Sequence, residues 1–97
     1  MASSDNQELE DYRRRIDDID EQLLRLLAQR MDVVRTIGAY KREHGLPALD
    51  QERWQAVLSS LLANAETLHL SPEFITSFYE LIHMRALEIE ADPNAVS

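Results

Sequence analysis

Residues 13–43 read RRRIDDIDEQLLRLLAQRMDVVRTIGAYKRE, and this stretch decides the fold. Its apolar residues recur at steps of three and four, the spacing of one face of an α-helix: Ile16, Ile19, Leu23, Leu26, Leu27, Val33, Val34 and Ile37. The pattern predicts one helix from about residue 7 to 43. At about 1.5 Å per residue this helix is about 50 Å long. A chain of 97 residues cannot cover such a helix by itself, so we expect it to lie along a second chain.

The rest of the chain predicts two shorter helices. Residues 45–47, Gly-Leu-Pro, form the clear interior break. Asp50 is a suitable N-cap for a second helix, and Ser71 caps a third whose first position is Pro72, where the missing N–H costs nothing. The prediction is therefore an all-α chain with one long and two shorter helices, forming an intertwined homodimer. We expect a single domain over residues 1–97, with an ordered core of about 8–91.

Composition excludes several classes of function. The formal net charge is −8, from 18 acidic and 10 basic residues, which argues against nucleic acid because its binding needs a basic face. The chain has no cysteine and therefore neither a disulfide nor a thiolate metal site. The spacing of His44, His69 and His83 does not indicate a metal site or a catalytic pair. The polar, acidic start and the lack of a long apolar run predict a cytoplasmic protein that does not bind membranes.

Against this acidic background, the cations of the first helix suggest a small, multiply negative ligand. Arg30 and Lys41 are 11 residues apart, which returns to within roughly 20° of the same helix face about 16 Å further along. Arg13 is 17 residues before Arg30, roughly 100° off that face and about 25 Å away. In an antiparallel dimer Arg13 can instead reach the partner's site. The spacing predicts two equivalent sites, each built from both chains.

These residues belong to a longer pattern that closely resembles the all-helical chorismate mutases. The resemblance covers roughly residues 9 to 90 and includes Phe74-Ile75 of the third helix. Its specific part fixes apolar and charged positions together: Arg13-x-x-Ile16-Asp17-x-Ile19-Asp20-x-x-Leu23-Leu24-x-Leu26-Leu27-x-x-Arg30, then Lys41, Pro47 and Asp50-Gln51-Glu52-Arg53. The resemblance implies an intertwined dimer of the type II fold. It also implies an isomerase that converts chorismate to prephenate by a pericyclic rearrangement, without a cofactor.

The resemblance also implies roles for individual residues. Arg30 and Arg13 of the partner subunit would each hold one carboxylate of the substrate, to which arginine offers a planar bidentate fork. Arg53 would complete the pocket, and Asp50 would lie near the ring hydroxyl. Lys41 would donate to the ether oxygen as the C–O bond breaks. Such a step needs no acid, base or nucleophile, and catalysis would come from conformational restraint and stabilisation of developing charge.

At three positions this sequence departs from the family pattern. Trp54 stands where a glutamate contacts the ring hydroxyl, and Ala86 replaces a small hydroxyl residue. Glu90 replaces the glutamine that shares the ether oxygen with the lysine, although fungal members resemble this chain there. A glutamate donates only when protonated, so Glu90 predicts activity that favours acidic pH.

The departures leave alternative functions open. The 4-amino-4-deoxychorismate mutases look similar at the positions of Trp54 and Glu90, and isochorismate-pyruvate lyases share the apolar replacement. A non-catalytic regulatory or interaction module is a further alternative, against which the retained inward cations argue because their desolvation is costly. Chorismate metabolism, the shikimate pathway and aromatic amino acid biosynthesis are the expected setting. The sequence does not determine the preferred ring substituent, primary or secondary metabolism, the protonation state of Glu90, or allosteric regulation.

Overall fold

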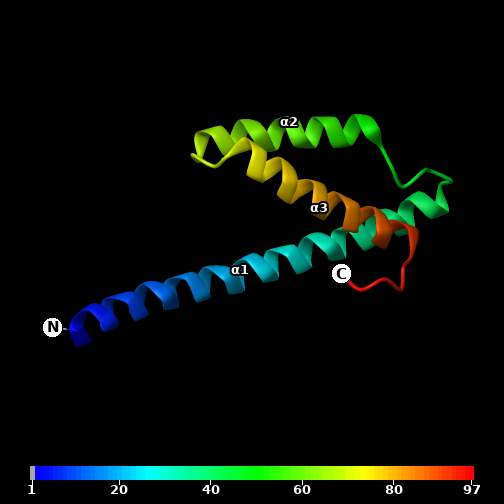
Figure 1. The fold of residues 1–97 in the computed structure, drawn as a ribbon. Coiled ribbons are helices and arrows are strands. Elements are labelled where there is room, and N and C mark those ends of the chain that lie inside the picture. Colours follow the sequence, from blue (N-terminus) through cyan, green and yellow to red (C-terminus); the bar gives the residue numbers. More distant parts are fainter. Residues whose placement is uncertain (1) are drawn as a thin grey trace. The chain divides into compact units, whose positions relative to one another are not determined.

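The computed structural model describes residues 2–97, with side chains from residue 6 onward, and this part of the chain is all-α (Figure 1). Helix α1 spans Ala2–Glu43, α2 spans Gln51–Thr67 and α3 spans Pro72–Ala91. The predicted class and helix order are confirmed. Helix α1 begins before residue 7, as expected if an established helix extends through polar residues more easily than a new one nucleates.

The chain forms two compact units that meet within α1. The first ends at Arg30 and the second comprises residues 31–97. In the first unit four side chains of the predicted helix face are exposed, Ile16, Ile19, Leu23 and Leu26, and Leu27 is half-buried. Leu9, Tyr12 and Leu24 of the same helix are also exposed. The apolar face that the sequence predicts is thus present, but the single chain leaves it uncovered.

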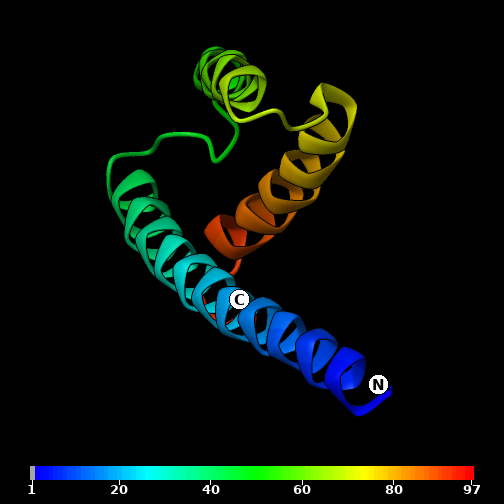
Figure 2. The ribbon, with the colours of Figure 1, turned by 90° about the vertical axis from the view of Figure 1, so that its left-hand side faces the viewer.

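In the second unit α2 and α3 run in opposite directions, and the C-terminal part of α3 crosses the end of α1 (Figures 1 and 2). Both predicted N-caps are confirmed. The Asp50 carboxylate accepts a hydrogen bond from the backbone N–H of Arg53 at 3.0 Å. The Ser71 hydroxyl accepts one from the N–H of Phe74 at 3.2 Å, and Pro72 occupies the first turn. These caps satisfy amide donors that a helix start leaves open.

Helices α1 and α2 end in the same kind of turn. At the end of α1, Gly45 has φ 64° and the N–H of Leu46 donates to the carbonyl of Lys41 at 2.8 Å. At the end of α2, His69 has φ 59° and the N–H of Leu70 donates to the carbonyl of Ala65 at 2.8 Å. A left-handed residue followed by this bond is the Schellman ending. The first turn could be predicted from the sequence because glycine readily adopts positive φ. The second could not, because histidine rarely does.

The core of the second unit is small. Among the described side chains, six apolar ones are buried: Met31, Val34, Ala65, Ile75, Ala86 and Ile89. The large apolar side chains of Phe74, Phe78 and Leu81 on α3 lie outside this core and are 60%, 42% and 64% exposed. A core of this size is modest for a chain of 97 residues.

Beyond α3 the chain folds back and two arginines hold it. Arg35 of α1 donates to the carbonyl of Ala95 at 2.6 Å and to the hydroxyl of Ser97 at 2.7 Å. Arg85 of α3 donates to the carbonyl of Val96. Within residues 2–97, none of the helices is long and apolar enough to cross a membrane.

Candidate functional site

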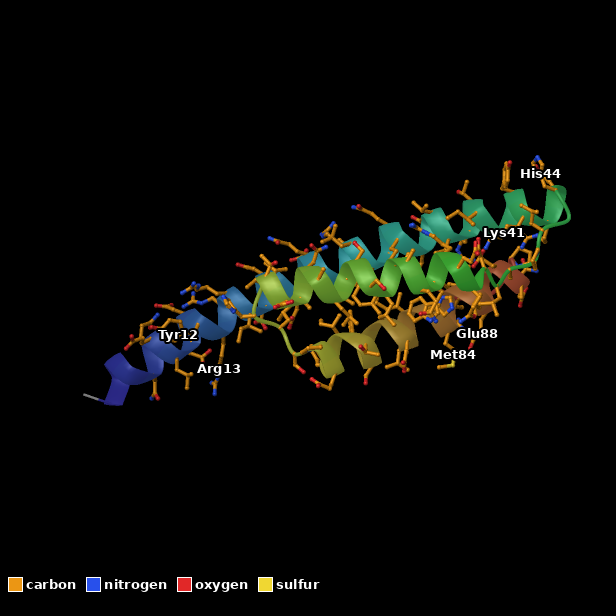
Figure 3. The ribbon with its side chains drawn as sticks, turned by 90° about the horizontal axis from the view of Figure 1, so that it is seen from above. Tyr12, Arg13, Lys41, His44, Met84 and Glu88 are labelled. Atoms are coloured by element: carbon orange, nitrogen blue, oxygen red, sulfur yellow. The ribbon has the colours of Figure 1, made fainter. Side chains whose placement is uncertain are left out.

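The end of α1 and the end of α3 bring Lys41 and Glu90 together. Lys41 Nζ lies 2.7 Å from Glu90 Oε1, and the two side chains are only 20% and 9% exposed. Figure 3 places Lys41 near the C-terminal end of α1, beside the last turns of α3. The same ammonium donates to the carbonyl of Ala48 at 2.6 Å. The pair lies in a unit whose fully buried side chains, among those described, are all apolar.

The pair is close but is not hydrogen-bonded in the usual sense. Glu90 Oε1 is buried and, among the described residues, no donor makes a well-oriented hydrogen bond to it, although Lys41 Nζ is 2.7 Å away. We regard the contact as an ion pair by distance, in which the carboxylate oxygen retains hydrogen-bonding capacity. Within the described chain, the ammonium of Lys41 is therefore the partner of this buried oxygen.

The first turn of α2 carries three of the predicted residues. Asp50 is occupied as the N-cap and Arg53 is exposed. Trp54 is half-buried, and its ring stacks on His83 of α3 with centroids 4.0 Å apart and an angle of 7° between the planes. Aromatic stacks of this kind contribute about 0.5–1.5 kcal/mol beyond the area they bury. The stack therefore fixes the start of α2 against α3.

His83 is the residue that the sequence reasoning missed. It was interpreted as an ordinary histidine, yet it lies two turns before Glu90 on the same face of α3, with Ala86 between them. Once Glu90 is a candidate site residue, the spacing of seven residues indicates that His83 lies on the same face of the helix. Residues 2–97 contain no cluster of three or more His, Cys, Asp or Glu side chains that could hold a metal ion.

Arg30 and Arg13 belong to the first unit and differ in their surroundings. Arg30 Nη1 is buried and, among the described residues, has no hydrogen-bond partner. Arg13 instead pairs with Glu10 at 2.8 Å, with the two side chains 60% and 58% exposed. It lies on the N-terminal part of α1 (Figure 3). A buried guanidinium nitrogen without an acceptor suits an anion site, because it gains a hydrogen bond when a carboxylate arrives.

The structure thus joins Lys41 to Glu90 and places Asp50, Arg53 and Trp54 together at the start of α2. Arg13 and Arg30 share the first unit, on one helix. The second unit supplies an ion pair of low exposure. The first unit supplies guanidinium groups, which can bind carboxylates.

Comparison with known proteins identifies the family. The chain matches the family model for chorismate mutase type II over residues 12–91, a span that contains every predicted site residue. It is similar to the T-protein of Haemophilus influenzae, with 37% identity over 67 residues that cover 69% of this chain and 18% of that protein. The T-protein of Enterobacter agglomerans is 34% identical over 85 residues, covering 88% and 23%.

A third relative is shorter. The 4-amino-4-deoxychorismate mutase of Streptomyces pristinaespiralis is 29% identical over 82 residues, which cover 84% of this chain and 64% of that protein. By contrast, the chain spans about a fifth of the length of the T-proteins. The resemblance inferred from the first-helix motif is confirmed, and the chain belongs to the chorismate mutase type II family.

Proposed function

We propose that this chain is a dimeric chorismate mutase that converts chorismate to prephenate by a pericyclic rearrangement, without a cofactor. The observation that carries the proposal is the Lys41–Glu90 pair, whose side chains are 20% and 9% exposed, inside a domain of this family. A protein with a net charge of −8 has no structural need to place its only lysine at a position of low exposure, because removing a charge from water is costly.

The proposed chemistry uses the pair directly. As the ether C–O bond breaks, negative charge develops on the oxygen, and a preorganised donor of low exposure stabilises it strongly. Lys41 would donate to this oxygen. Glu90, whose Oε1 lies 2.7 Å from Lys41 Nζ, would lie beside the same ether oxygen as the second group of the pair. The ether oxygen would then lie within about 3 Å of both groups.

The arginines would hold the substrate in its reactive conformation. Arg30 would bind one carboxylate, gaining the acceptor that its buried Nη1 lacks in the described chain. Arg13 of the partner subunit would bind the other carboxylate, and Arg53 would close the pocket. Holding both carboxylates favours the compact conformer in which the two reacting carbons approach each other.

The decisive test is steady-state turnover of the purified protein on chorismate, 4-amino-4-deoxychorismate and isochorismate in parallel. Under the proposal, prephenate forms from chorismate with the highest kcat/KM of the three. Pyruvate released from isochorismate as the main reaction would assign the chain to the lyases. A protein inactive on all three, and not stabilised by a dicarboxylate bicyclic ether that resembles the transition state, would be a non-catalytic module.

The proposed dimer has its own test. Leu23 is 57% exposed on the apolar face of α1, and burying such a side chain contributes about 1.5–3 kcal/mol. Leu23→Glu is expected to convert a dimer into a monomer by sedimentation velocity. Gln22→Glu, the same charge change at the adjacent exposed position, serves as the control and should remain dimeric. A wild-type chain that sediments as a monomer at micromolar concentration would refute the dimer.

A second candidate, 4-amino-4-deoxychorismate mutase, is favoured by a specific observation. Trp54 stacks on His83 at the start of α2, so no carboxylate stands at the position of Trp54 to accept from a ring hydroxyl. The relative of that activity is 29% identical over 82 residues. If the amino substrate exceeds chorismate by about tenfold in kcat/KM, a difference worth about 1.4 kcal/mol, this candidate replaces the first.

Trp54→Glu tests whether this position faces the ring substituent. A hydrogen bond to a charged group contributes about 1.5–3 kcal/mol, so the variant is expected to raise kcat/KM for chorismate roughly tenfold. Trp54→Phe keeps an aromatic ring against His83 without adding an acceptor, and it should stay within about threefold of wild type. Equal values for both variants would place Trp54 away from the substituent and remove the main support of the second candidate.

A further inference from the structure

The backbones of Gly38 in α1 and Glu90 in α3 lie close together. A Cβ added at Gly38 would lie 2.9 Å from the Cα of Glu90 and 3.3 Å from its carbonyl oxygen. Carbon atoms attract best at about 3.5–4.0 Å, so even one methyl group forces the two backbones apart. Gly38 is buried and is helical, so its value here lies in the missing side chain rather than in an unusual φ.

The backbone of Glu90 cannot yield easily. Its neighbour Ile89 is 1% exposed, the most deeply buried large side chain described. The guanidinium of Arg42, one turn after Gly38, donates from Nη1 to the carbonyl oxygen of Glu90. The same Nη1 would lie 3.4 Å from the added Cβ. Packing and a hydrogen bond therefore hold the last turn of α3 against this point of α1.

The contact between Gly38 and the backbone of Glu90 lies next to the proposed catalytic pair, Lys41 and Glu90. Gly38 and Lys41 are three residues apart on α1 and so lie on neighbouring positions of one face. Lys41 Nζ meets Glu90 Oε1 at 2.7 Å beside the point where the two backbones touch. We propose that Gly38, together with Arg42, is a positioning element that holds Glu90 at the distance from Lys41 that the reaction requires. The catalytic part of this inference rests on the function proposed above.

The first experiment is the kinetics of Gly38→Ala. In an exposed helix interior this change stabilises a protein, but here it is expected to lower Tm because α3 must move. We expect kcat to fall about tenfold while KM stays within about threefold, since a displacement approaching 1 Å misaligns the reacting groups. Ala39→Gly is the control, because Ala39 is exposed on the same turn. It should lower Tm through helix propensity and leave kcat within about twofold.

The same substitution made in the Glu90→Ala variant distinguishes an effect on the position of the Glu90 carboxyl group from a general effect on packing. In Glu90→Ala the carboxyl group is gone, so adding Gly38→Ala is expected to change kcat by less than about twofold while still lowering Tm. A tenfold further loss of kcat in that background would show that Gly38 acts through something other than Glu90, and it would overturn the inference.

A readout independent of turnover distinguishes failure of this inference from failure of the proposed function. The coupling between Lys41→Met and Glu90→Gln is measured by a double-mutant cycle of unfolding, once with Gly38 and once with Gly38→Ala. We expect the coupling to shrink in the second cycle. If Gly38→Ala does not fold, Arg42→Met replaces it, since it removes the bond to the Glu90 carbonyl without a clash. An unchanged coupling overturns the inference even in an active enzyme, and a reduced one supports the positioning of the pair even in an inactive protein.

Discussion

Lys41→Met is expected to lower kcat for chorismate by about a hundredfold or more, the usual effect of removing one preorganised donor to a developing oxyanion. Lys41 is the only lysine of the chain, and its ammonium approaches Glu90 Oε1 at 2.7 Å and the carbonyl of Ala48 at 2.6 Å. The methionine side chain retains the apolar stem and loses the charge. Because the donor acts on the transition state, KM should change much less than kcat.

The loss must be separated from a loss of stability, since Lys41→Met leaves Glu90 without its cation. A polar group of low exposure without a partner costs roughly 1–3 kcal/mol. The double variant Lys41→Met with Glu90→Gln removes both charges, so its Tm should recover toward wild type. Its kcat should stay low. Recovery of both kcat and Tm would show that Lys41 is structural and would remove it from the proposed mechanism.

Arg30→Met is expected to lower kcat/KM for chorismate by roughly a hundredfold to ten-thousandfold, because two hydrogen bonds to a charged group contribute about 1.5–3 kcal/mol each. The distinctive expectation concerns stability. Arg30 Nη1 is buried and unpartnered among the described residues, so replacing it with an apolar side chain of similar length should leave Tm unchanged or raise it. Activity lost without loss of stability is typical of a binding residue.

Arg25→Met provides the matched control on the same helix. Arg25 pairs with Glu21 at 2.7 Å, and its side chain is 73% exposed. Exposed pairs contribute about 0.2–1 kcal/mol, so this variant should keep both Tm and kcat/KM close to wild type. Both variants are measured by steady-state kinetics and thermal unfolding. If Arg30→Met destabilises the protein and retains kcat/KM, Arg30 is a structural arginine and the carboxylate-binding role is wrong.

Local patterns in the sequence determined the helices and their starts. Apolar spacing of three and four predicted the long helix, and Asp50, Ser71 and Pro72 marked the starts of α2 and α3. These features depend on residues within a turn or two of each other, so they can be predicted from the sequence. The end of α2 could not be predicted in this way because His69 takes the left-handed conformation usually adopted by glycine.

The long motif from Arg13 to Arg30 also identified the family, since apolar and charged positions must satisfy both helix geometry and the site. Residue roles remain proposals, but their candidate positions came from the sequence. The same pattern predicted the apolar face of α1, and the length of the helix predicted that a single chain would leave this face exposed, as it does. Periodicity does not say what covers such a face.

Only the tertiary structure decided which distant residues meet. Trp54 stacks on His83, and Arg42 reaches the carbonyl of Glu90 across 48 residues of sequence. Gly38 lies inside the long helix, and only the structure shows that the backbone of Glu90 in α3 lies close against it. Such contacts depend on how two helices cross, and the crossing follows from side-chain volumes packed in three dimensions. Helix periodicity therefore determined the elements of this protein, and packing determined the position of Glu90 beside Lys41.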